Sequence, residues 1–423
     1  IAKDTTYTTS SPISLSGTTI SHATSGASAG SDGDSANQTP AYGATFKVPY
    51  LTVNNTGVIK SEKDSSNNYY TGTLGMVLEN TAITATNSGS IDLRGNGSIG
   101  VYVTNEGKFI NDVGAIVNST QVKAGANPGS IGIVAKDGVV ENKGIINSEN
   151  IGVYGSTGVG TTEIKHTGTL NIKSGTGVYL KDTGASNTVS ASLNGGTILA
   201  ASGLSNISAV VAEERSKVIL NGTNITVNDN SNAIALIGNS GKKAELEIKS
   251  GNLNIGSQGV GIYSKESDVT VDSSYSGTLS LGEKSTGIYI DEKSSLSGTG
   301  IININYAGVD KGVGIFYKEG IRDNKVGITN SILNDNLINI YGENLSLTNS
   351  AEQIVGKNGI GIYVIGSAAK PSIIANNAEL KLDGEDSIGM YAKDSTTITS
   401  LGTISGSNSK NDKIGVFLDG GDI

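Results

Sequence analysis

Pairs of carboxylates are the first residues of this chain that could do chemistry. Carboxylates gather locally at Asp32/Asp34, Glu213/Glu214, Asp291/Glu292 and Glu385/Asp386. Two carboxylates that face one groove can cleave a glycosidic bond, one acting as the acid and the other as the base or nucleophile. These pairs stand in turn-like segments beside Lys or Ser and do not recur in phase along the chain. We therefore expect solvated turns, with a sugar-cleaving enzyme as the rival interpretation.

Other groups for catalysis or metal binding are scarce. The chain contains no cysteine, which excludes disulfides, cysteine zinc ligands and thiol nucleophiles. Its two histidines, His22 and His166, lack metal-ligand spacing, and we expect side chains of this kind to be solvated. Calcium-binding repeats of the G-G-x-G-x-D type are also missing. We expect no cofactor, no metal and no enzymatic activity.

Glycine-rich words offer another kind of chemistry. The word "GVGIYSKES" (Gly259–Ser267) could open a phosphate loop, because paired glycines let a backbone approach an anion. A phosphate loop occurs once, between a strand and a helix, whereas related words recur throughout this chain. We call the glycine that precedes the aliphatic residue the marker glycine; it occurs at Gly75, Gly100, Gly132, Gly152, Gly177, Gly261, Gly287, Gly314, Gly361, Gly389 and Gly415, with Ala209 and Ala233 in its place twice. If one gap of 47 residues counts as two turns, the mean spacing is about 26 residues, which indicates a solenoid.

Two further lines of short strands recur between the marker words. One reads "GTLNI" at 168–172 and "GTLSL" at 277–281, and a weaker one reads "SDVTV" at 267–271. Each alternates with period two, as a strand with one buried face does. Every line returns in the same direction, so the copies must stack in parallel about 4.8 Å apart, with right-handed crossovers. The sequence predicts an all-β, right-handed parallel β-helix with three strands per coil.

The marker strand predicts a core face and an outer face. The residue after the marker glycine is always apolar, as at Ile262, Ile288 and Ile362, and should form a column in the core. The glycine should then point outward, beside an aromatic residue that covers it. The outward aromatic column comprises Tyr263, Tyr289, Phe316, Tyr363, Tyr391 and Phe417. It could bind sugars or a partner protein, but we favour the structural role of covering glycine and stacking between coils.

The repeat also predicts how the chain is organised. Residues 1–73 should form irregular N-terminal coils with flexible excursions, and residues 74–423 a continuous β-helix. Loops should leave it near 119–130, 183–197 and 317–336. Arg322, one of three arginines, lies in the last of these, where a loop on a rigid scaffold is a candidate contact site for a ligand.

Charge and hydropathy limit the classes of partner. The net charge is −9, and acidic and basic residues are mixed without a basic stripe, which disfavours a nucleic-acid partner. The longest apolar run is far too short to span a membrane, so we expect no membrane insertion. The chain begins at Ile1 without a methionine or signal peptide, and we interpret it as a piece of a longer protein.

The words "GIGIYVIGS", "SIGMYAKDS", "GVGIYSKES" and "GIGIVAKDG", with their "GTLNI" partners, resemble repeats in the passenger regions of large fusobacterial type V autotransporter adhesins. The resemblance runs from about Gly75 to the end, and Ala209 and Ala233 depart from it. It implies Sec export, an outer-membrane translocator barrel beyond Ile423, and a β-helical stalk at the cell surface. It also implies adhesion to surface proteins or glycans of host cells or other bacteria. The shared motif is scaffold, so no binding residue of that family can be mapped here.

The leading hypothesis is thus a non-enzymatic surface adhesin. A polysaccharide lyase or glycosidase is the first rival, because a β-helix can carry either activity. The second rival is a structural stalk that displays a binding tip encoded elsewhere in the parent chain.

Overall fold

The structure is a computed structural model. It describes residues 13–15, 19–22, 42–46, 52–61, 66–69, 71–79, 83–120, 129–184, 189–239, 241–306, 308–330, 335–406 and 412–423. These residues form strands and turns, and none of them belongs to a helix long and apolar enough to cross a membrane. The chain divides into two units, mainly residues 1–204 and 218–423, and each is described by itself.

Three parallel sheets, named A, B and C, build the first unit. Sheet A contains β1 (Ile13–Leu15), β4 (Thr52–Asn55), β7 (Thr84–Asn87), β10 (Lys108–Asn111), β13 (Val139–Asn142), β16 (Thr162–His166) and β19 (Val189–Leu193). Sheet B contains β2 (Thr19–His22), β5 (Val58–Ser61), β8 (Ser90–Leu93), β11 (Ile116–Ser119), β14 (Ile145–Ser148), β17 (Thr169–Ile172) and β20 (Thr197–Ala200). Sheet C contains β3 (Tyr42–Phe46), β6 (Leu74–Glu79), β9 (Ile99–Thr104), β12 (Ile131–Lys136), β15 (Ile151–Ser156) and β18 (Thr176–Lys181).

The second unit repeats this arrangement. Its sheet B contains β23 (Asn224–Val227), β26 (Leu253–Ile255), β29 (Thr278–Leu281), β32 (Ile301–Tyr306), β34 (Gly327–Asn330), β36 (Gln353–Val355), β39 (Glu379–Leu382) and β42 (Thr403–Gly406). Its sheet C contains β24 (Asn232–Ile237), β27 (Val260–Lys265), β30 (Thr286–Ile290), β33 (Gly312–Asn324), β35 (Leu337–Asn349), β37 (Ile360–Ile365), β40 (Ile388–Lys393) and β43 (Ile414–Asp419). Its sheet A contains β25 (Glu245–Ser250), β28 (Asp268–Ser276) and β31 (Ser295–Gly298). β38 (Ser372–Asn376) pairs with the second half of β35, and β41 (Thr396–Ser400) pairs with β38. The residues of β21 (Ser208–Glu213) and β22 (Lys217–Asn221) are divided between the two units.

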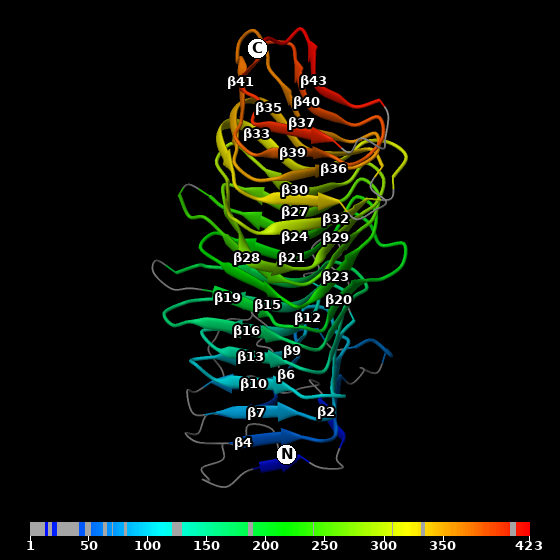
Figure 1. The fold of residues 1–423 in the computed structure, drawn as a ribbon. Helices are drawn as coiled ribbons and strands as arrows, with labels where there is room; N and C mark the ends of the chain where they lie inside the picture. Colours follow the sequence, from blue (N-terminus) through cyan, green and yellow to red (C-terminus); the bar gives the residue numbers. More distant parts are fainter. Residues whose placement is uncertain are drawn as a thin grey trace. The chain divides into compact units, whose positions relative to one another are not determined.

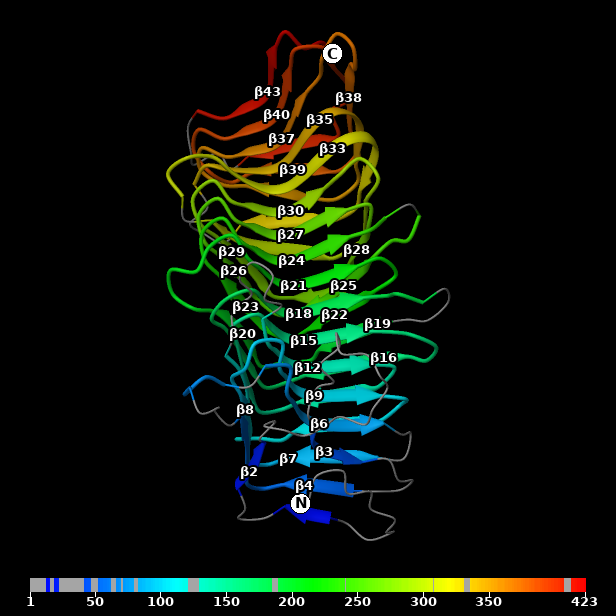
Figure 2. The ribbon, with the colours of Figure 1, turned by 180° about the vertical axis from the view of Figure 1, so that it is seen from behind.

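Each coil takes one strand from each sheet in turn. β10, β11 and β12 form one coil, and their counterparts β13, β14 and β15 pair with them in parallel and in register. Figure 1 shows β7, β10, β13 and β16 stacked from the N-terminal side, with their arrows pointing to the right on the near face. Figure 2 shows β6, β9 and β12 also running to the right when seen from behind, which makes the winding right-handed. The predicted right-handed parallel β-helix with three strands per coil is confirmed.

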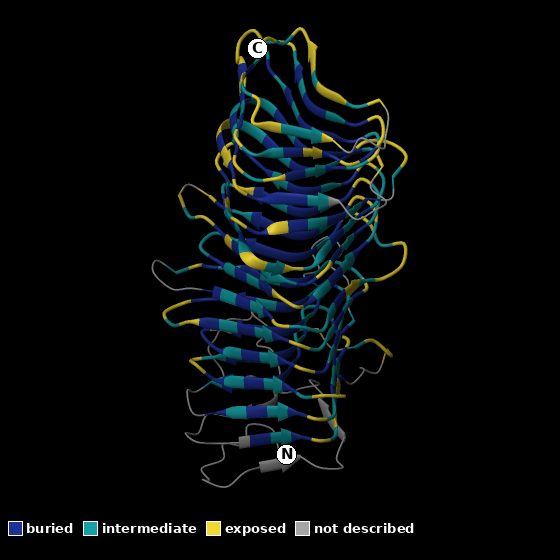
Figure 3. Cartoon of the chain, viewed as in Figure 1, coloured by how far each residue is buried: buried dark blue, intermediate teal, exposed yellow. Residues whose placement is uncertain are grey.

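Alternation along each strand separates the core from the surface. In β17, Leu170 and Ile172 are buried, while Thr169 and Asn171 are partly exposed. Figure 3 shows this alternation along the strands of both units. Isoleucine, valine and threonine suit such half-buried strands because their branched side chains pack well on a pleated surface.

The aliphatic residue after the marker glycine lies in the core, as predicted. Ile262, Ile288 and Ile362 are completely buried, and Ile262 lies beside Ile288 in the next coil. Burial of each such side chain contributes about 1.5–3 kcal/mol before entropy is counted. The same position in the last coil, Val416, is partly exposed.

The prediction that the marker glycine points outward is wrong. A Cβ placed on Gly287 would lie 2.6 Å from the carbonyl oxygen of Gly314 in the next coil and 3.3 Å from a methyl group of Leu279. Leu279 is a buried residue of sheet B, so this Cβ would point toward the core. The pairing skips the marker glycine, and strict alternation is lost because the glycine and the residue after it are both buried. The glycine is needed for close contact between successive coils, and the aromatic ring does not cover it.

The gap of 47 residues does contain two coils. β35 supplies the missing marker strand, with Asn339 in the place of glycine and Ile340 beside Ile315 and Ile362. The excursion predicted at 317–336 is wrong for residues 317–324 and 327–330, because β33 continues to Asn324 and pairs with β35, and β34 follows. Residues 331–334 lie outside the described part. Both β33 and β35 pass from sheet C around a corner toward the strands of sheet A.

Other predicted irregular segments also contain strands. β19 occupies residues 189–193 of the loop predicted at 183–197, and residues 185–188 lie outside the described part. Residues 121–128 of the loop predicted near 119–130 also lie outside it. Within 1–73, β1 pairs with β4 and β2 with β5, so coil strands are already present there.

Candidate functional site

The aromatic residues predicted to lie outside form a continuous column in the second unit. Seven rings follow one another with centroid separations between 4.5 and 5.3 Å: Tyr263, Tyr289, Phe316, Tyr341, Tyr363, Tyr391 and Phe417. Tyr341 was missed by the sequence pattern because its coil has Asn339 instead of the marker glycine. Among the described residues of the first unit, Tyr154 and Tyr179 stack at 5.7 Å. The column is therefore a distinctive surface feature of the second unit.

The orientation of the rings decides what they can bind. From Tyr263 to Tyr341 successive rings are stacked with interplanar angles of at most 27°. Their faces are therefore covered by one another, and their edges face the solvent. Tyr341 and Tyr363 meet at 87°, which interrupts the stack. This part of the column presents a ridge of ring edges and hydroxyl groups rather than open faces for a sugar.

The tyrosine hydroxyls supply polar groups along this ridge. Tyr341 donates to Glu343 at 3.0 Å, and Tyr391 donates to Asp419 at 3.1 Å. Burial raises the pKa of Tyr289, and it is also the main cause of the raised pKa of Tyr341, so both phenols stay neutral at physiological pH. The column can thus contribute apolar area and neutral hydrogen-bonding groups.

Arg322 is not on a loop, contrary to the prediction. It lies within β33 and is only 7% exposed. Its guanidinium donates to four backbone carbonyls, those of Asp291 at 2.6 Å, Ser294 at 2.7 Å, and Lys318 and Glu319 at 2.8 Å. The side chain ties β33 to the corner of the preceding coil, so its hydrogen-bonding capacity is used within the fold.

A buried amide ladder runs along sheet A of the first unit. Asn55, Asn87, Asn111 and Asn142 each donate from Nδ2 to the side chain of the next rung, at 2.8 to 3.1 Å. The last acceptor is His166, which is 1% exposed, so the expectation of a solvated histidine is wrong at this position. The side chain of His22 lies outside the described residues. The second unit has a shorter ladder, formed by Asn324, Asn349 and Asn376.

The described carboxylates of these pairs lie in turns, except Glu213, which ends β21. Asp291 accepts from Ser294 and from the backbone of Lys293 and Glu266, and at 6% exposure it is buried rather than solvated. Glu214 is paired with Lys242 at 3.2 Å. Asp32 and Asp34 lie outside the described residues. Within the part of the chain that the structure describes, no three carboxylate or histidine side chains are grouped to hold a metal ion.

Comparisons with known proteins give no relative for this chain. No family model matches it, and neither a curated protein nor a solved structure does.

Proposed function

We propose that this chain is a non-enzymatic segment of a bacterial surface adhesin that attaches to host cells or to other bacteria. The observation that carries the proposal is the row of seven partly exposed rings along the second unit. Aromatic side chains provide much contact area for little loss of side-chain entropy, and they are enriched where proteins bind partners.

The repeated geometry suits an extended partner. Adjacent rings are separated by about one coil, so a partner lying along the column would meet the same group again at each coil. Many weak contacts of this kind add up when they are made at the same time. Surface proteins or glycans of host cells or bacteria are the partners that we propose, whereas the net charge of −9 disfavours nucleic acids.

The resemblance to fusobacterial autotransporter passengers supports a proposal about where the protein is located. The marker words that carry the resemblance build sheet C of the β-helix in this chain. On this basis we propose a position outside the outer membrane, with a translocator barrel in the parent chain. The segment itself would not insert into a membrane.

Cell binding by the purified chain tests this proposal. We expect it to bind host cells or bacteria in flow cytometry, and a variant with Tyr289→Ser and Tyr363→Ser to bind more weakly. The matched control carries Tyr154→Ser and Tyr179→Ser, a stacked pair of the first unit that lies outside the column, and it should bind like the original chain. Circular dichroism establishes that each variant is folded.

Two outcomes would favour the rivals. Absence of binding to any surface would favour a structural stalk over direct adhesion. Turnover of polysaccharides by the purified chain would favour a lyase or glycosidase.

A further inference from the structure

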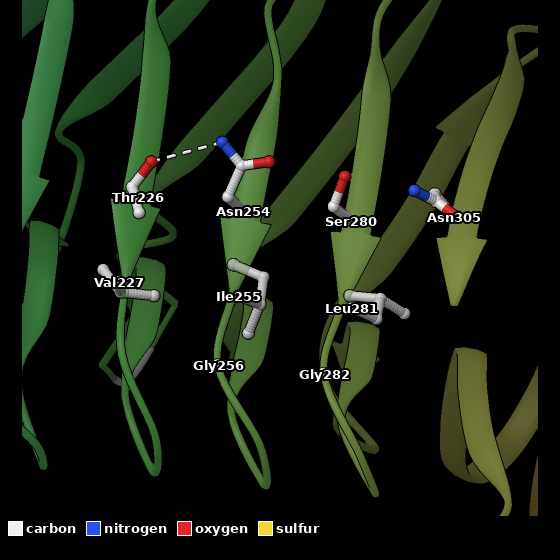
Figure 4. Close-up of a pocket in the computed structure, with 9 residues that line it drawn as sticks. All are labelled: Thr226, Val227, Asn254, Ile255, Gly256, Ser280, Leu281, Gly282 and Asn305. Atoms are coloured by element: carbon white, nitrogen blue, oxygen red, sulfur yellow. Dashed lines mark hydrogen bonds between the residues drawn. The ribbon is translucent and has the colours of Figure 1, made fainter. Parts of the chain in front are cut away.

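A groove crosses the outer face of sheet B in the second unit. It is open along one side, has a volume of about 340 Å³, and extends over β23, β26, β29 and β32. Figure 4 shows a row of polar side chains along it, one from each strand: Thr226, Asn254, Ser280 and Asn305. The register of the four strands places these residues side by side in successive coils. The groove therefore repeats one polar position about every 4.8 Å.

Two of the lining residues are glycines that follow the ends of strands. Gly256 follows Ile255 and Gly282 follows Leu281, at the point where the chain leaves sheet B. A Cβ at Gly256 would lie 2.4 Å from the backbone nitrogen of Asp229, and one at Gly282 would lie 2.7 Å from the backbone of Gly256. Any other residue would clash there. These glycines therefore allow successive coils to pack closely. The side chains of Val227, Ile255 and Leu281, at most 5% exposed, lie in the core behind the polar row.

The polar row has unused hydrogen-bonding capacity. Asn254 Nδ2 donates to Thr226 at 3.2 Å, but among the described residues no hydrogen bond joins Ser280 to Asn254 or to Asn305. The adjacent outward row of the same sheet is different, because Asn224, Asn252, Thr278 and Asn303 are joined at every step. That second row stabilises the sheet, whereas the groove row retains donors and acceptors for another molecule.

Charge and shape together indicate the chemistry of the ligand. All nine residues that line the groove are uncharged, although the chain carries a net charge of −9. A charged ligand would find no opposite charge among them. A peptide strand would find no backbone partner on this sheet face, because the main-chain groups of the strands already pair within the sheet.

We propose that the groove binds a neutral, linear oligosaccharide lying across the four coils. Sugar hydroxyls would hydrogen-bond to Asn254, Ser280 and Asn305 along the polar row. The repeated sugar units of such a ligand would meet one polar side chain in each coil of the groove. This inference rests on the proposed adhesin function and names a ligand class for it, at a site separate from the aromatic column.

The test measures binding of the 423-residue chain to cellohexaose, xylohexaose, maltohexaose and hexa-N-acetylchitohexaose by isothermal titration calorimetry. We expect at least one of them to bind. Ser280→Tyr, which fills the groove, should weaken that binding by about tenfold or more. Thr278→Tyr lies on the same outward face of β29 but does not line the groove, and it should change the affinity by less than about twofold. If Ser280→Tyr fails to fold, Asn254→Asp, which preserves shape and adds a charge, should still weaken binding.

The inference is overturned if none of the four hexasaccharides binds at millimolar concentration, or if Ser280→Tyr and Asn254→Asp bind as well as the original chain. Binding of anionic hexasaccharides alone, or of an extended peptide instead, would also overturn it. Cell attachment without hexasaccharide binding would refute the groove but not adhesion. Hexasaccharide binding that Ser280→Tyr abolishes, without cell attachment, would support the groove and refute adhesion.

Discussion

Acidification should destabilise the first unit through His166, which ends the buried amide ladder. Asn142 donates to Nδ1 of His166 at 3.1 Å, and Nε2 lies 3.2 Å from the carbonyl oxygen of Thr197. The ring is therefore held neutral, with Nδ1 accepting and Nε2–H donating. Two rungs below, Asn111 makes the two corresponding contacts, because it accepts from Asn87 and donates to the carbonyl oxygen of Ile145. The imidazole thus takes the place of one more amide.

The magnitude follows from the pKa of this histidine. Burial lowers it from 6.5 to about 4, and the hydrogen bond to Thr197 opposes only part of that shift. As the pH falls below 6.5, the unfolded chain takes up a proton that the folded chain cannot accept until about pH 4, so stability is lost across this window. The full loss is roughly 3 kcal/mol, and about 2 kcal/mol of it should be reached at pH 5. The contribution is fully present above pH 7.

His166→Asn is the matched control for this effect. An asparagine at this position can accept from Asn142 and donate to Thr197 but does not titrate. Urea unfolding at pH 7.5 and pH 5 should show that the original chain loses about 2 kcal/mol more than the variant. An NMR titration of histidine labelled at Cε1 should give a pKa near 4 for the resonance that the variant lacks. A pKa of about 6 or above, or an equal pH dependence in both proteins, would refute this reasoning.

The remaining predictions concern free energies of unfolding measured with urea. Gly287→Ala should destabilise the chain by about 1–3 kcal/mol, because the new Cβ would lie 2.6 Å from a carbonyl oxygen. Gly415→Ala should be close to neutral, because the nearest atom to its Cβ is 3.9 Å away. Equal effects would contradict the role assigned to the marker glycine. Arg322→Met should cost about 3 kcal/mol because it leaves buried carbonyls without a donor, against less than about 1 kcal/mol for Arg94→Met at an exposed ion pair. A neutral Arg322→Met would show that the four hydrogen bonds do not stabilise β33. Asn349→Ala should cost about 2 kcal/mol, because it removes a hydrogen-bond partner from both Asn324 and Asn376. Asn147→Ala, on a partly exposed ladder, should cost less than about 1 kcal/mol, because water can replace the lost amide. An equally large cost for Asn147→Ala would contradict the importance of burial.

Much of the fold could be predicted because the repeat supplies the same information many times. Period-two alternation gives the buried face of every strand, and the constant direction of the words requires parallel stacking. The aliphatic column at Ile262, Ile288 and Ile362 follows from these two facts alone. Even the missing coil was visible as a double gap, although nothing in "LINIY" identified Tyr341 as part of the aromatic column.

The errors arose where one position departs from strict alternation. The marker glycine and the residue after it are both buried, and glycine is required because a Cβ would meet the backbone of the next coil. A single strand cannot reveal this distance. Arg322 follows a charged, glycine-containing segment that is typical of loops, but tertiary pairing with β35 keeps it in a strand. His166 was expected to be solvated because its partners lie 24 and 31 residues away. The groove depends on register between four coils and therefore could not be seen in any one of them.

The stacking of coils in register is the central claim, and a designed disulfide tests it most directly. The chain has no cysteine, so Thr270→Cys with Ser297→Cys introduces the only possible pair, at positions where β28 and β31 lie side by side and the two hydroxyl oxygens are 3.0 Å apart. The control combines Asp268→Cys with Ser297→Cys, which are offset by two residues and about 8 Å apart, too far for a disulfide. Mass spectrometry after mild oxidation and thiol alkylation should show a disulfide in the first variant and free thiols in the control. Free thiols in the first variant, or equal cross-linking in both, would contradict the register of the coils.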